Sequence, residues 1–96
     1  MILTQINKLI SEYLIHSYAY YIRNESLVSD NEFDDIVKCL LDGYDLIKDS
    51  NHPHKHLIKR DLLESYTGFN LKFPVIVKVC FNQIMKEKEN SINDLF

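Results

Sequence analysis

The clearest structural signal in the chain lies at residues 29–44, which read Ser-Asp-Asn-Glu-Phe-Asp-Asp-Ile-Val-Lys-Cys-Leu-Leu-Asp-Gly-Tyr. Ser29 and Glu32, three positions apart, form the pattern of a capping box. In this motif the serine hydroxyl accepts from an amide of the first turn and the glutamate reaches back to the serine amide. Behind it runs an apolar stripe at helical spacing: Phe33, Ile36, Val37, Leu40, Leu41 and Tyr44. The stretch predicts an amphipathic helix over 30–48, with Gly43 near its end.

A second apolar stripe precedes this helix. It consists of Ile6, Leu9, Ile10, Tyr13 and Leu14 and predicts a helix over 3–23. This helix ends in an aromatic group made of Tyr18, Tyr20 and Tyr21. Residues 24–28 break the period and predict a short loop. The first half of the chain is therefore expected to be a helical hairpin, 3–23 and 30–48.

The second half is expected to add two helices. Residues 59–66 predict a short helix that Gly68 is placed to end, and 69–73 alternate as an extended segment does. Pro74 suits a helix start, and the following apolar pattern predicts a helix over 75–87. The β-branched run 75–79 is also compatible with a strand. Residues 88–96 are polar and predict a frayed tail, so the prediction is a small all-α domain spanning 1–96.

Composition and charge narrow the class of protein. The 96 residues suffice for one domain, and 46% hydrophobic residues with two glycines and two prolines favour a helical globule over disorder. A net charge of −3 has the wrong sign for a general nucleic-acid binder. Residues 25–50 hold eight acidic side chains and two lysines, a local charge of −6, whereas 55–78 is mostly basic. Either these are two solvated faces, or the basic segment forms a rim that meets a phosphate.

The cysteines and the N-terminus indicate the compartment. Cys39 and Cys80 fall on apolar stripes and are expected to be small buried hydrophobes in a reducing environment. Polar residues interrupt 1–10, so no signal peptide is expected, and no apolar run is long enough to cross a bilayer. A cytoplasmic location is expected.

A motif in the first half resembles a known family. Tyr20-Tyr21, a short loop and Ser29-Asp30-Asn31-Glu32-Phe33-Asp34 are followed by His52-Pro53. This pattern resembles the N-terminal Ia subdomain of bacterial NAD-dependent DNA ligases. In that subdomain a helix ends in an aromatic pair, and Ser-Asp-x-Glu-Tyr-Asp opens the next helix at the same spacing. The resemblance covers residues 13–53.

The resemblance implies a nicotinamide nucleotide site, because the ligase subdomain holds the nicotinamide mononucleotide half of NAD. By position it implies contacts from Tyr20, Tyr21, Asp30, Phe33 and Asp34. Tyrosine rings can stack on the flat cationic nicotinamide, and carboxylates can accept from its carboxamide and ribose hydroxyls. Phe33 stands where the ligases usually have tyrosine, so one hydroxyl is missing. Both aspartates also fit ordinary helix-start statistics, and the tyrosines fit ordinary packing.

The chain departs from the ligases in what it lacks. It contains no Lys-x-Asp-Gly motif and hence no lysine for adenylylation, and it has no room for further ligase domains. Its second half is similar to small standalone phage proteins related to DNA ligase. The similarity rests on His52-Pro53-His54-Lys55-His56-Leu57-Ile58, Asp61-Leu62, Thr67-Gly68, Lys72-Phe73-Pro74 and Ile76-Val77-Lys78. This similarity implies an entire phage protein in the host cytoplasm.

The histidine-rich loop has three interpretations. It is a solvated loop, a phosphate site built from His54, Lys55, His56 and Lys59, or a metal site whose further ligands the sequence does not identify. His16 is expected to be structural. No metal is predicted.

Three functions follow, of which a binding module is preferred, with the choice between a nucleotide ligand and a protein partner left open and an enzyme least favoured. The first is a non-catalytic binding module for nicotinamide mononucleotide or NAD, with Lys55 or Lys59 near the phosphate. The second is a phage protein-interaction module that docks its acidic segment 25–50 on a host DNA-metabolism or defence protein. The third is a small enzyme acting on a nicotinamide nucleotide. No direct nucleic-acid or membrane partner is expected, and the sequence does not indicate the oligomeric state.

Overall fold

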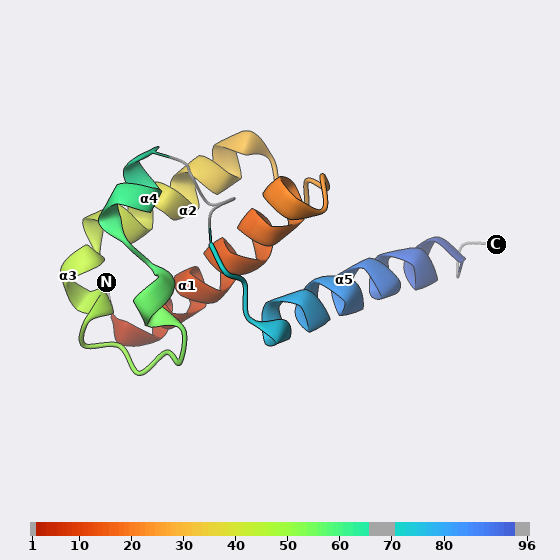
Figure 1. Ribbon diagram of the computed structural model, residues 1–96. Helices are drawn as coiled ribbons and strands as arrows, with labels where there is room; N and C mark the ends of the chain where they lie inside the picture. Colours follow the sequence, from red (N-terminus) through yellow and green to blue (C-terminus); the bar gives the residue numbers. More distant parts are fainter. Residues whose placement is uncertain (1, 66–70, 94–96) are drawn as a thin grey trace.

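The structure, a computed structural model, describes residues 2–65 and 71–93, and every regular element in these ranges is helical (Figure 1). The expected all-α fold is thus confirmed. The elements are α1 (Leu3–Ser17), the π-helical η1 (Tyr18–Ile22), α2 (Asp30–Asp42), α3 (Tyr44–Ile47), the 3₁₀ turn η2 (Lys55–Leu57), α4 (Arg60–Ser65) and α5 (Val75–Asn93).

The first helix changes its winding near its end. A single helix over 3–23 was expected, but α1 gives way to the π turn η1 at Tyr18. The Arg23 amide donates to the Tyr18 carbonyl five residues back, at 3.2 Å. Asn24 then takes a φ of 54°, a left-handed conformation that asparagine tolerates better than most residues. This residue ends the helix and turns the chain into the loop.

The start of α2 confirms one half of the expected capping box. The Ser29 hydroxyl oxygen accepts from the Glu32 amide at 3.2 Å, which satisfies a first-turn donor. The other half differs. The Glu32 carboxylate accepts from the Ser29 hydroxyl at 3.2 Å, and not from the Ser29 amide.

The second helix is shorter than the expected 30–48. It ends at Asp42, because Gly43 leaves the helical region with φ −97° and ψ 18°. The Gly43 amide donates to the Cys39 carbonyl at 3.0 Å, and the Gly43 carbonyl accepts from the Leu46 amide at 2.9 Å. The glycine therefore closes α2 and opens the one-turn helix α3.

The core is built around α1, which contacts α2, α3 and α5. Its apolar stripe supplies most of the central side chains, and the other helices cover it. The buried hydrophobic residues are Ile6, Ile10, Tyr13, Leu14, Tyr18, Ala19, Ile36, Val37, Leu40, Ile47, Ile58, Leu63, Val77 and Phe81. Cys39 and Cys80, which were expected to be buried, are free and only half-buried.

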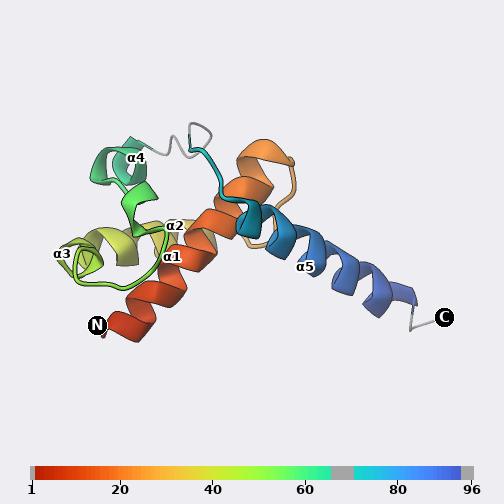
Figure 2. The ribbon, with the colours of Figure 1, turned by 60° about the horizontal axis from the view of Figure 1, so that its bottom comes forward.

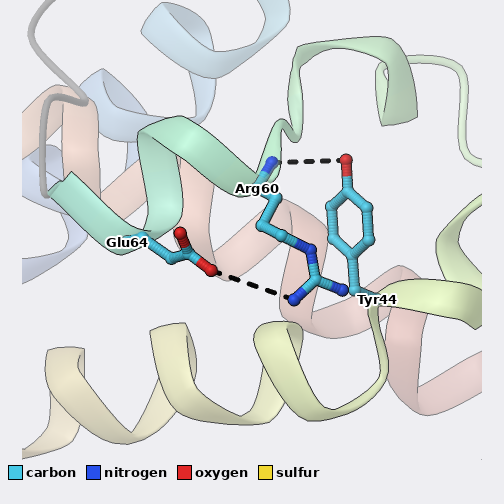
Figure 3. A network of polar contacts seen from close by, with 3 residues as sticks. All are labelled: Tyr44, Arg60 and Glu64. Atoms are coloured by element: carbon cyan, nitrogen blue, oxygen red, sulfur yellow. Dashed lines mark hydrogen bonds and ion pairs between the residues drawn. The ribbon is translucent and has the colours of Figure 1, made fainter.

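The Tyr44 side chain at the start of α3 contacts the first residue of α4 (Figure 3). Its hydroxyl accepts from the Arg60 amide at 3.2 Å, and the Arg60 guanidinium lies 4.7 Å from the centre of its ring. Arg60 also faces Glu64 one turn later, at 3.9 Å. The helix begins at Arg60, one residue after the expected start. Tyr66, Gly68 and the first part of the expected extended segment lie outside the described residues.

The last helix resolves the helix-or-strand alternative at 75–79 in favour of helix. Val77 and Phe81 are buried against the body, whereas the later turns project away from it (Figures 1 and 2). The molecule is accordingly 48 Å long and about half as wide. The expected end at 87 and the frayed tail from 88 are wrong over 88–93, because the helix continues to Asn93. Residues 94–96 lie outside the described part.

Candidate functional site

A cavity of about 260 Å³ opens between the end of the first helix and the start of α2. Every side chain that the ligase-like motif singled out lines this cavity: Tyr20, Tyr21, Asp30, Phe33 and Asp34. Four further residues complete its lining, namely His16, Ser26, Leu27 and Val28. The structure therefore brings together five residues that come from two helices.

Aromatic rings form the apolar walls of the cavity. The Tyr20 and Tyr21 rings meet edge to face, 5.0 Å apart at 85°. Tyr20 is 50% exposed, so its ring is available to a ligand. On the opposite helix, Phe33 stacks on the buried Tyr13 ring at 6.1 Å and 22°. The contact with Tyr13 holds the Phe33 ring in place. Burial raises the pKa of Tyr13 to about 12, so the Tyr13 hydroxyl stays neutral.

The π turn helps to place the tyrosine pair. In a π turn an amide donates to the carbonyl five residues back, where in an α turn it donates four residues back, so the π turn widens the helix. His16 precedes Tyr20 by four positions and Tyr21 by five, and all three side chains line the cavity. Such turns are found often at functional sites. Helical periodicity predicts the helix but does not predict this local change of winding.

Two carboxylates from α2 give the cavity negative charge. Asp30 is exposed and Asp34 is half-buried, and they lie four residues apart on one face of the helix. No lysine or arginine of the described residues lines the cavity. The site therefore favours a cationic ligand over an anionic one.

His16 is the residue that the sequence analysis missed. Its Nδ1 atom is buried and has no hydrogen-bond partner within the described residues. Burial lowers the pKa of His16, although Glu12 and Glu32 act in the opposite direction. The His16 ring is thus a neutral polar group at the edge of the cavity, and its Nδ1 atom is available for a hydrogen bond. Its spacing of four and five residues from Tyr20 and Tyr21 is the sequence signal for this position.

The histidine-rich loop is held against the first half of α1. The His54 amide donates to His52 Nδ1 at 3.0 Å, so the proton of His52 lies on Nε2, which donates to the Ser11 hydroxyl oxygen at 2.8 Å. Asn7 is bonded to Ser50 and, at 2.9 Å, to Asn51. These contacts give the loop a structural role, and burial lowers the pKa of His52.

The four residues of the expected phosphate site do not line one common cavity. The Lys55 ammonium donates to the carbonyls of Lys48 and Ser50, at 2.7 and 2.8 Å, and so stabilises the end of α3. His54 lines a groove beside α5, while Lys55 and His56 line a separate depression next to Tyr44. Lys59 is exposed and lines neither of them.

The loop and the cavity lie against different parts of the first helix. The loop hydrogen-bonds to Asn7 and Ser11 and shares a groove with Leu14 and Ile15, whereas the cavity is lined from His16 onward. Neither Lys55 nor Lys59 lines the cavity, so the structure does not bring these lysines together with the tyrosines and aspartates.

No protein-family model matches this chain, and no solved structure matches it. The likeness to the ligase subdomain therefore depends on the motif within residues 13–53.

Within 2–65 and 71–93, no three histidine, cysteine, aspartate or glutamate side chains converge as a metal site would require. Among the helices described, none has an apolar stretch of the length that a bilayer crossing needs.

Proposed function

We propose that the protein is a non-catalytic binding module whose cavity takes the nicotinamide half of a nicotinamide nucleotide. One observation carries the proposal: the five residues chosen from the ligase-like motif line a single cavity. They lie on two helices that are separated by a loop, and spacing alone does not require their side chains to converge. A non-catalytic role is proposed because the chain has no Lys-x-Asp-Gly motif.

The size of the cavity supports a small ligand. Sites for drug-sized molecules usually enclose about 300–1,000 Å³. At about 260 Å³ this cavity suits one ring with its sugar, and the rest of a dinucleotide would stay outside.

The lining supplies each interaction that a nicotinamide ring needs. Tyr20, Tyr21 and Phe33 offer aromatic surface, which attracts a cation by roughly 0.5–1 kcal/mol at exposed sites and more when water is excluded. Asp30 and Asp34 can accept from the carboxamide and the ribose hydroxyls. The cavity is partly open, so binding is expected to be weak and to need millimolar ligand for detection.

A thermal-shift measurement tests the proposal. Nicotinamide mononucleotide and NAD should each raise the melting temperature, and adenosine monophosphate should not. A ligand at 100 times its dissociation constant stabilises the folded state by about 2.7 kcal/mol. The absence of a shift with both nicotinamide nucleotides at millimolar concentration would contradict the proposal.

Calorimetry with matched variants locates the binding. Asp34→Ala removes a carboxylate that lines the cavity, and Asp42→Ala removes an exposed one on the same helix away from it. The first change should abolish the heat of binding, and the second should leave it unchanged. Both variants should keep the helical circular dichroism spectrum, which controls for loss of the fold.

A second candidate is a protein-interaction module. Every acidic side chain of the segment 25–50 except Asp34 is exposed, so this segment presents a negative surface. Such a surface fits a basic patch on a host protein. Capture of a host protein that is lost on charge reversal at Asp42 and Asp45, but kept in Asp34→Ala, would favour this function over nucleotide binding.

A further inference from the structure

We infer, on the basis of the proposed function, that the cavity recognises the positively charged riboside of nicotinamide and makes no use of its phosphate. The ligand class is an N-ribosylated pyridinium. The reduced, uncharged form of the ring is then a poorer ligand, and the 5′-phosphate ester binds no more tightly than the riboside. The inference depends on the charges around the cavity.

The carboxylates dominate the field at the cavity. Asp30 and Asp34 line it, and Glu12 and Glu32 lie close enough to act on His16 at its edge. No lysine or arginine lines it within the described part of the chain. A pyridinium ring between these groups gains attraction, whereas a phosphate would be repelled.

The N-terminus of α2 is the strongest argument for a phosphate, because helix starts attract anions. Its charge is equivalent to roughly +0.5 of an elementary charge. Asp30 and Asp34 bring two full negative charges to the same place, and Ser29 already satisfies the Glu32 amide. The carboxylates therefore outweigh the dipole.

Two basic side chains outside the cavity contact other groups. The Arg23 guanidinium lies over the Phe81 ring, 5.3 Å from its centre. The Lys55 ammonium donates to two backbone carbonyls beside the other half of α1. His16 adds no positive charge near neutral pH, because burial holds it in the neutral form.

Calorimetry with three ligands in one buffer tests the inference. The ligands are nicotinamide riboside, nicotinamide mononucleotide and reduced nicotinamide riboside. The oxidised riboside should bind at least as tightly as the mononucleotide. It should also bind roughly tenfold more tightly than its reduced form, which has nearly the same shape and no charge.

Variants connect this selectivity to the carboxylates. Asp34→Asn keeps the shape of the side chain and removes its charge, so it should bring the oxidised and reduced ribosides to similar affinities. Asp42→Asn, outside the cavity, should preserve the roughly tenfold difference. Asp30→Asn at an exposed position is the substitute if Asp34→Asn fails to fold.

The outcomes separate this inference from the proposed function. Tighter binding of the mononucleotide than of the riboside, or equal binding of the oxidised and reduced ribosides, would overturn the inference and leave a nicotinamide site in place. Failure of all three ligands to bind would overturn the proposed function and the inference with it.

Discussion

Replacing His16 by leucine is expected to stabilise the protein while weakening ligand binding. The imidazole Nδ1 is buried without a hydrogen-bond partner among the described residues. A buried polar atom in that state costs about 1–3 kcal/mol. His16 as a whole is only half-buried, so the lower end of this range applies. Leucine fills a similar volume with no polar atom to satisfy.

The expected gain in the free energy of unfolding is about 1 kcal/mol, since the penalty of the unpaired atom disappears. For a domain of this size, such a gain raises the melting temperature by about 4–8 °C. Leucine also has a higher helix propensity than histidine, and this difference would contribute a few tenths of a kcal/mol to the apparent effect.

His16→Gln controls for that contribution. Glutamine and leucine have nearly the same helix propensity, but glutamine keeps a polar group at this position. The quantity to compare is therefore the difference between the two variants, measured by urea denaturation and thermal melting at pH 7.5. Calorimetry with nicotinamide mononucleotide then reports whether binding is lost in His16→Leu.

The reasoning would be refuted if His16→Leu melted at or below the temperature of His16→Gln. That result would mean that the imidazole is satisfied in the folded protein and contributes to its stability. If His16→Leu were stabilised and still bound the ligand with full affinity, the result would support the cost of the unpaired atom. It would also show that His16 does not contribute to binding.

Three further predictions concern the scaffold. Phe81→Ala should lower the free energy of unfolding, measured in urea, by about 3–5 kcal/mol, because this buried ring packs edge to face on Tyr18 at 5.4 Å and holds α5 on the body. A loss below about 1 kcal/mol would show that other contacts hold α5 in place. Ser29→Ala should cost about 0.5–2 kcal/mol through loss of the α2 cap, and an unchanged melting curve would contradict this role. Acidification should destabilise the protein, because burial lowers the pKa of both His16 and His52 in the folded state and the unfolded chain therefore binds protons more readily. Stability should be constant above the ordinary histidine pKa of about 6.5 and fall as the pH drops from there through the lowered folded values, which thermal melts across this range would reveal.

The helices were predictable where a local signal fixes them. Ser29 caps α2 as expected, and Pro74 precedes a helix that begins at Val75. The boundaries were wrong where two local preferences compete. The apolar stripe continues past Gly43, yet the chain leaves the helical region there and starts a new turn. Polar residues after 87 were expected to fray, but α5 continues to Asn93.

The cavity was predictable only through the motif. Periodicity places Tyr20 on one helix and Asp34 on another, and the short loop between the helices brings them to one end of the hairpin. Contacts between distant segments were not accessible in this way. Nothing local to Lys55 indicates that its ammonium is taken up by the carbonyls of Lys48 and Ser50, or that its loop lies beside the first half of α1.

The π turn at Tyr18–Ile22 places a constraint on chain length that substitutions do not reveal. A turn of this kind holds about one residue more than an α turn, so it behaves as an insertion absorbed within a helix. Deleting a single residue from it would restore ordinary α winding, leave the chain beyond the turn in register, and shift the residues within the turn. The pair Tyr20-Tyr21, which lies inside the turn, would then change its direction relative to His16, although no aromatic ring had been removed. The spacing between His16 and the loop is therefore as much a part of the binding surface as the side chains themselves.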